Sequence, residues 1–198
     1  MKKVFLAAVA AIIFPVLPAA SQTAPENNWY YLMDQPGAAA VDNRGASLAT
    51  SCNESGNVVL TLAVYPDSEA YDLFRDGLEI ARSSNSWRTD SDFNMTAFKM
   101  LTSVDNSSFV DIGTPAYFRG GHAGEEVKSI ILIRAFSAET GAAQQLLSLF
   151  REIRAAKTSI TVRVNAPRAG NVSADFNFSA KRSTAAMEHI FRVRCSDL

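Results

Sequence analysis

Carboxylates are numerous in this chain but show no spacing that predicts a catalytic pair, so its two histidines are the most informative of the residues that could act as acids, bases or metal ligands. His122 ends an Arg-Gly-Gly-His sequence and shortly precedes Glu125 and Glu126. An imidazole beside carboxylates can serve a hydrolase as general base or contribute to a zinc site. No G-x-S-x-G elbow accompanies it, and zinc needs three or four clustered ligands. A solvated glycine loop is the simpler interpretation, so we expect no metal, no cofactor and no catalytic residue. His189, on a predicted last helix, is interpreted as an exposed residue.

The two cysteines, Cys52 and Cys195, have a different chemistry. They lie far apart in the sequence and form no C-x-x-C motif, which a redox-active pair would favour. In an oxidising compartment an isolated pair of cysteines forms a structural disulfide. Such a bridge would join an early strand to the C-terminus and stabilise the fold by up to about 5 kcal/mol in the chain-entropy model.

Recognition chemistry is expected from arginines and aromatic residues, which dominate binding anchors. Arg75 and Asp76 precede a glycine and could be a recognition pair, although a charged pair at a strand edge is the simpler interpretation. Other aromatic residues that could line a binding face, or fill strands and core, are Trp29, Tyr30, Tyr31 and Tyr65. The predicted binding surface comprises Arg75, Asp76, Trp87, Tyr117, Phe118, Arg119 and His122.

The N-terminal residues have the pattern of an export signal. Lys2 and Lys3 precede an apolar run that ends at Leu17, and small residues follow as far as Ser21. This pattern predicts a secretory signal peptide over residues 1–21. The apolar run is shorter than the roughly 20 residues that a membrane-spanning helix needs. We therefore expect a periplasmic or secreted protein without stable membrane insertion, formed by residues 22–198.

The charge balance limits the partners. The full chain has 19 basic and 20 acidic residues, and losing Lys2 and Lys3 would leave a net charge near −3. A chain with this balance has no electrostatic preference for nucleic acid or anionic lipid. The expected partner is an envelope protein or a cell-wall component.

The elements that must position these residues are mostly strands. Up to about Phe118 the apolar residues form short runs broken by turn residues, which is typical of many short strands. Strands are expected near residues 29–33, 38–42, 47–52, 58–65, 95–101 and 109–112, with a less regular one at 73–81 and a loop at 113–126.

The second half changes its hydrophobic period. Ser129–Phe136 is almost continuously apolar and predicts a central strand buried on both faces. Residues 138–156 place Leu146, Leu149, Phe150 and Ile153 on one helical face. Two alternating strands at 159–165 and 172–178 then form a hairpin. A last helix capped by Ser183 or Thr184 should direct Met187, Ile190 and Phe191 towards the core. These elements predict one mainly β domain with two helices, similar to a β-sandwich, whose C-terminal helix is held by the disulfide.

This order of elements resembles the small periplasmic proteins associated with type VI secretion (VasI/TagO type). The resemblance rests on Ser51-Cys52, Asn57–Val64, Arg75-Asp76-Gly77, Trp87, Leu146–Lys157, Ile160–Val164, Ala174–Ser179, Ala185-Ala186-Met187 and Cys195. In that family an early strand cysteine pairs with one that follows a short C-terminal helix. Residues 106–126 lie outside the resemblance. The invasion-associated locus B family has a similar Phe-x-Phe-Ser closing strand, but its cysteines lie closer together. The resemblance to the type VI secretion proteins implies a non-enzymatic β-sandwich accessory protein of a Gram-negative envelope, with no catalytic residue.

We therefore expect a non-enzymatic, exported binding or accessory protein that recognises an envelope protein or polymer. One alternative is an inhibitor or immunity protein of a cell-wall hydrolase, which would insert an exposed loop such as Tyr117–Glu126 into its target. The other alternative is a hydrolase that uses His122.

Overall fold

Strands account for most of the chain that the computed structural model describes. The described residues are 27–32, 38–43, 45–52, 57–66, 68, 70–71, 98–120, 129–137, 140–166, 172–193 and 195. Within them, ten strands and two helices form a single domain, so the predicted mainly β class is confirmed.

Six antiparallel strands form the larger sheet. Its first four strands follow the chain in order, and the sheet continues through β8 to β7. In spatial order they are β1 (Tyr30–Leu32), β2 (Ala38–Asp42), β3 (Ala46–Cys52), β4 (Asn57–Val64), β8 (Ser129–Ser137) and β7 (Ala116–Gly120).

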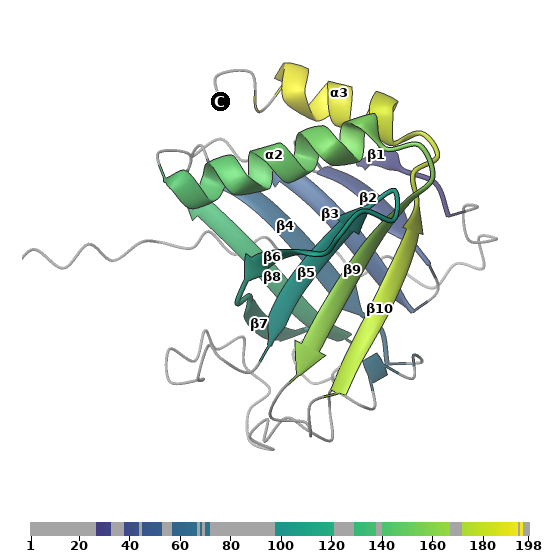
Figure 1. The fold of residues 1–198 in the computed structure, drawn as a ribbon, viewed down its shortest axis with the longest axis vertical. Helices are drawn as coiled ribbons and strands as arrows, with labels where there is room; N and C mark the ends of the chain where they lie inside the picture. Colours follow the sequence, from purple (N-terminus) through teal and green to yellow (C-terminus); the bar gives the residue numbers. More distant parts are fainter. Residues whose placement is uncertain are drawn as a thin grey trace, which may run out of the picture.

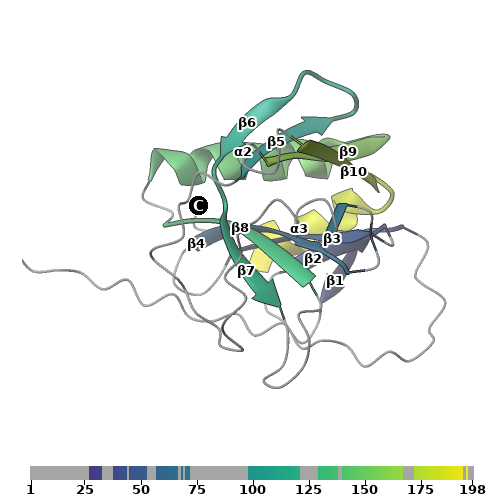
Figure 2. The same ribbon diagram turned by 90° about the horizontal axis from the view of Figure 1, so that it is seen from below.

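Four antiparallel strands form the smaller sheet. In spatial order they are β10 (Val172–Ser179), β9 (Ser159–Ala166), β5 (Lys99–Val104) and β6 (Val110–Gly113). The two sheets face each other as layers (Figure 2). This arrangement agrees with the expected sandwich-like architecture.

Two helices lie side by side across the same end of both sheets (Figure 1). Helix α2 (Gly141–Ala155) begins after Thr140, whose hydroxyl accepts a hydrogen bond from the amide of Ala143. Its predicted apolar residues Leu146, Leu149, Phe150 and Ile153 are all buried. Helix α3 (Ser183–Val193) buries Met187 and Ile190, while Phe191 is partly buried against the same core.

The core lies between the layers because both sheets turn apolar residues inward. On β4, the side chains of Val58, Leu60, Leu62 and Val64 are fully buried. On β9, the side chains of Ile160, Val162 and Val164 are fully buried as well. The helices close one end of this layer with the residues named above, and all of these side chains belong to one cluster.

The hairpin turn between β5 and β6 is fastened to the segment that follows α2. Asp105 and Asn106 have φ values of 51° and 60°, the left-handed pair that a tight type I′ turn requires. The Asp105 carboxylate accepts backbone hydrogen bonds from Thr158, Lys157 and Ser159 at 2.7–3.2 Å. These bonds, led by the one from Thr158, lower the pKa of Asp105 to about 2.

The predicted disulfide is confirmed. Cys52 at the end of β3 is bonded to Cys195, which follows α3, and their Cα atoms are 5.6 Å apart. Both residues are buried in the core cluster. The bond therefore fixes the C-terminal helix against the larger sheet.

Two local predictions were wrong in part. β8 is an interior strand between β4 and β7, as expected, but it is buried on both faces only over residues 130–132, and Ala135 is exposed. Ser183 and Thr184 do not cap α3: the Thr184 hydroxyl donates to the carbonyl of Arg154, and the Ser183 hydroxyl has no partner among the described residues. The strand predicted at 95–101 is present as β5, which begins at Lys99 and extends beyond the predicted end to Val104; residues 95–97 lie outside the described part of the chain.

Neither helix of the described part has the length and apolar character needed to cross a bilayer. The predicted signal peptide at 1–21 and the predicted strand at 73–81 lie outside the described residues.

Candidate recognition surface

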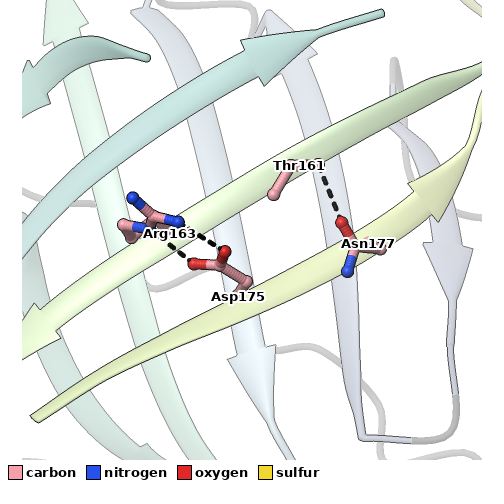
Figure 3. Close-up of polar contacts among 4 residues, drawn as sticks. All are labelled: Thr161, Arg163, Asp175 and Asn177. Atoms are coloured by element: carbon pink, nitrogen blue, oxygen red, sulfur yellow. Dashed lines mark hydrogen bonds and ion pairs between the residues drawn. The ribbon is translucent and has the colours of Figure 1, made fainter. Parts of the chain in front are cut away.

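The outer face of the smaller sheet carries an ordered set of polar side chains. Alternation along β9 and β10 buries the apolar residues and turns Thr161, Arg163, Asp175 and Asn177 outward (Figure 3). We call these four residues, together with Phe109 just before β6, the polar face.

Arg163 and Asp175 lie directly opposite each other in the β9–β10 register. The guanidinium donates two parallel hydrogen bonds to the carboxylate, from Nε at 2.6 Å and from Nη2 at 2.7 Å. These hydrogen bonds raise the pKa of Arg163 and lower the pKa of Asp175. Both side chains are 37% exposed. The pair is therefore held in one geometry while it stays accessible to a partner.

Two further contacts fix the same surface. The guanidinium of Arg163 lies over the ring of Phe109, with its central carbon 4.0 Å from the ring centroid. The hydroxyl of Thr161 donates to the side-chain oxygen of Asn177 at 2.8 Å. Arginine stacked on an aromatic ring and paired with a carboxylate is already ordered, so binding a partner costs it little conformational entropy.

The register extends this surface across the sheet. Arg163 is opposite Leu101 of β5, and Leu101 is in turn opposite Asp111 of β6. A row of four outward side chains from four strands thus runs across the sheet: Asp175, Arg163, Leu101 and Asp111. The row combines two carboxylates, one guanidinium and a half-buried apolar residue.

A second arginine, Arg134 of β8, points to the inside of the sandwich with the neighbouring inward residues of that strand. Burial lowers the pKa of its guanidinium, and the charge of Asp111 opposes this effect. It donates a hydrogen bond to the carbonyl of Thr114 and lies over the ring of Phe136 at 4.4 Å. A side chain added at Gly113, where φ is 87°, would meet Arg134 at 2.9 Å. Arg134 therefore links the two sheets where β6 leads into β7.

The structure places only part of the predicted binding surface. Tyr117, Phe118 and Arg119 belong to the edge strand β7, which pairs with β8. The expectation of a loop from residue 113 to 126 is therefore wrong for Ala116–Gly120. Arg75, Asp76, Trp87 and His122 lie outside the described residues, as do Glu125 and Glu126.

Two of the aromatic residues near the N-terminus make contacts within the domain. Trp29 is 1% exposed, and its indole nitrogen donates to the carbonyl of Ser179 at 2.8 Å. Tyr31 contacts the ring of His189 on α3, with ring centroids 3.8 Å apart. Their alternative interpretation as structural residues is correct for Trp29. His189 itself is exposed, as expected.

The polar face was not among the predicted binding residues, although the sequence carries a signal for it. Alternation in 159–165 and 172–178 puts Thr161 and Arg163 on the same side as Asp175 and Asn177. Opposite charges at matching hairpin positions then favour the register that is seen. Phe109 gave no such signal because it precedes β6, and β5 lies between β6 and the strand that carries Arg163.

Among the described residues, no three His, Cys, Asp or Glu side chains gather closely enough to hold a metal ion. Comparisons of the chain with protein families, with curated protein sequences and with solved structures gave no match.

Proposed function

We propose that this chain is an exported, periplasmic recognition module that binds an envelope protein or polymer without turning it over. The observation that carries the proposal is the pre-ordered Arg163–Asp175–Phe109 cluster on an exposed sheet face. The predicted signal peptide and the Cys52–Cys195 bond are compatible with a compartment outside the cytosol. The resemblance to type VI secretion accessory proteins supports the same class of function.

Stability alone gives little reason for such a cluster. An ion pair at this exposure contributes about 1 kcal/mol or less to the free energy of unfolding. Arginine and aromatic side chains, by contrast, supply most of the affinity at protein interfaces. The cluster is therefore better suited to binding a partner than to holding the sheet together.

The chemistry of the polar face also favours binding over catalysis. Asp175 is kept as an anion by Arg163, which lowers its pKa, and a general acid or base works best with a pKa near the working pH. Thr161 already donates its hydroxyl proton to Asn177. These groups are satisfied by one another and present a fixed pattern of charge.

Affinity capture tests this proposal. The tagged protein is incubated with the envelope fraction of its own cells under non-reducing conditions, and bound material is identified by mass spectrometry. We expect one stoichiometric partner. The Arg163→Glu variant should capture about tenfold less of it, or less still, as expected when an interface anchor is removed. Arg151→Glu is the matched control, because Arg151 is an exposed arginine on α2 away from the polar face.

Equal capture by the wild type and by Arg163→Glu would contradict the proposal. The double variant Arg163→Asp with Asp175→Arg adds a second check. It keeps an ion pair and the stability of the hairpin but reverses the charge pattern, so it should fold normally and lose the partner.

A further inference from the structure

The edge strand β10 has an open half that is suited to pairing with another strand. β10 and β6 form the two edges of the smaller sheet. β6 has four residues and an irregular register against β5, which limits pairing at that edge. β10 has eight residues in unbroken register with β9. The longer and more regular edge is therefore β10.

The register shows which backbone groups of β10 face outward. The amide of Ala180 donates to the carbonyl of Thr158, in the same register as the strand pair. In an antiparallel pair the residues bonded to the neighbour alternate. Even-numbered residues of β10 thus bond to β9, and the amides and carbonyls of Ser173, Asp175, Asn177 and Ser179 point away from it.

Side chains from the N-terminal region already occupy one half of this edge. The Asn43 amide donates to the carbonyl of Asn177 at 3.4 Å, and the Trp29 indole donates to the carbonyl of Ser179 at 2.8 Å. The amide of Ser179 reaches the Asn27 side chain at 3.5 Å. These contacts fall on alternate residues, which agrees with the assigned direction of the backbone groups.

The other half of the edge is open. Among the described residues, the outward backbone groups of Ser173 and Asp175 contact no hydrogen-bonding partner, and both residues are exposed. Natural edge strands are usually protected by proline, lysine, a bulge or an unpaired inward charge. β10 has none of these devices, and its one charge is paired with Arg163.

We propose that Ser173–Asp175 accepts one extended segment of a partner protein as a fifth strand of the smaller sheet. This inference rests on the proposed recognition function and narrows the partner to a protein. Backbone hydrogen bonds to Ser173 and Asp175 supply the pairing, as in other cases of strand addition. The new strand would also continue the polar face beyond Asp175.

The side chains beside the open edge define the chemistry of that segment. Ala174 is partly buried against the core, so the residue that packs next to it is apolar. Asp175 lies on the polar face, so the residue beside it is basic or polar. The segment therefore alternates apolar with basic or polar residues.

A second copy of the chain fits the same edge less well. Antiparallel pairing of two β10 edges centred on Asp175 would place two aspartates directly opposite each other, which is unfavourable. The register centred on Ala174 places Ser173 opposite Asp175, so it brings no basic side chain to the carboxylate. A different chain with a basic residue opposite Asp175 avoids both limits.

The test uses linear heptapeptides displayed on phage and selected against the oxidised protein. Selected peptides are synthesised, and their affinities are measured by calorimetry for the wild type, Ser173→Pro and Ser173→Ala. Proline at 173 removes an outward amide and leaves the bonds to β9 intact. We expect Ser173→Pro to weaken binding by about tenfold or more, and Ser173→Ala, which keeps the amide, by less than about twofold.

Amide hydrogen exchange on the wild type gives a result that does not depend on the folding of a variant. Ser173 and Asp175 should exchange rapidly in the free protein and become protected with peptide bound. Ala174 and Phe176 should be protected in both states because they bond to β9. Slow exchange of Ser173 and Asp175 in the free protein, or selected peptides that ignore Ser173→Pro, would overturn the proposal.

This outcome is separable from failure of the proposed function. If Arg163→Glu no longer captures the envelope partner but Ser173→Pro still does, the proposed recognition function is supported. In that case the partner does not bind at the open edge of β10. If both variants keep the partner, both proposals fail.

Discussion

The two sheets of this sandwich differ in their outer faces. On the larger sheet, several residues that point away from the inter-sheet core are also buried: Ala40, Ala49, Val59, Thr61 and Ile131 are all less than 9% exposed, while Ala135 on the same face is exposed. On the smaller sheet, the corresponding face carries the polar face and is open to solvent. The larger sheet thus buries side chains on both sides, whereas the smaller sheet has one side exposed to solvent.

This difference explains where each chemistry is placed. The disulfide joins the larger sheet to the C-terminus, and the only bidentate ion pair in the described part of the chain lies on the smaller sheet. Burial of apolar surface makes a large contribution to the free energy of folding. Arginine and aromatic side chains at an exposed surface contribute strongly to the free energy of binding. Under the proposed function, the larger sheet would mainly stabilise the fold and the outer face of the smaller sheet would bind the partner.

The contrast is tested most strongly by placing the same substitution on both outer faces. Thr61→Lys puts a charge at a position that is 5% exposed on the larger sheet. It should lower the free energy of unfolding by about 3 to 5 kcal/mol, since an unpaired buried charge has no compensating partner. Thr161→Lys on the smaller sheet should change it by about 1 kcal/mol or less. Urea unfolding measures both, and equal effects would contradict the contrast.

Removing the disulfide should have the next largest effect. The Cys52→Ser, Cys195→Ser double variant is expected to lose about 2 to 5 kcal/mol of unfolding free energy, because its unfolded chain is no longer constrained. Chemical denaturation with and without reductant provides the measurement. The wild type should respond to reductant and the double variant should not; a wild-type midpoint that ignores reductant would rule out a stabilising role for the bond.

Asp105 should make the attachment of the smaller sheet to α2 sensitive to acid. Its pKa is about 2 in the folded protein and close to 3.8 in the unfolded chain, so its stabilising contribution is complete above pH 4. That contribution is lost as the pH falls towards 2. Asp105→Asn has no such charge, and the gap between the thermal midpoints of the two proteins should therefore shrink from pH 5 to pH 2. A constant gap would show that the carboxylate is not held as described.

The smallest effect on stability is expected at the centre of the polar face. In a double-mutant cycle, Arg163→Ala and Asp175→Ala should give a coupling energy of about 1 kcal/mol or less, since the pair is partly exposed. High salt should reduce this coupling further. A coupling energy of several kcal/mol would show that the ion pair mainly stabilises the fold, which would argue against its proposed role in recognition.

Local patterns in the sequence predicted most of the elements. Alternation identified β9 and β10, and helical spacing identified the buried face of α2. The position of β8 within its sheet could not be found in this way, because a nearly continuous apolar run says that a strand is buried but not which strands flank it. The loop expected after Pro115 became β7 because pairing with β8 outweighs weak local preference.

The candidate site was harder to predict for a related reason. Arg163 and Asp175 meet through the register of two strands, and Phe109 reaches Arg163 from a third part of the chain. Such a cluster depends on tertiary contacts rather than on a motif. Single residues that attract attention in the sequence, such as Trp29, can instead be core residues.

The bond between Cys52 and Cys195 also makes most of this protein a covalently closed ring. It spans 143 residues of the chain, so a single cut in any peptide bond inside that span leaves the two fragments joined. Such a cut would be invisible by size under non-reducing conditions and would appear only after reduction. If the chain is exported as proposed, the ring can close only after Cys195 has crossed the membrane, so the bond would form late in translocation.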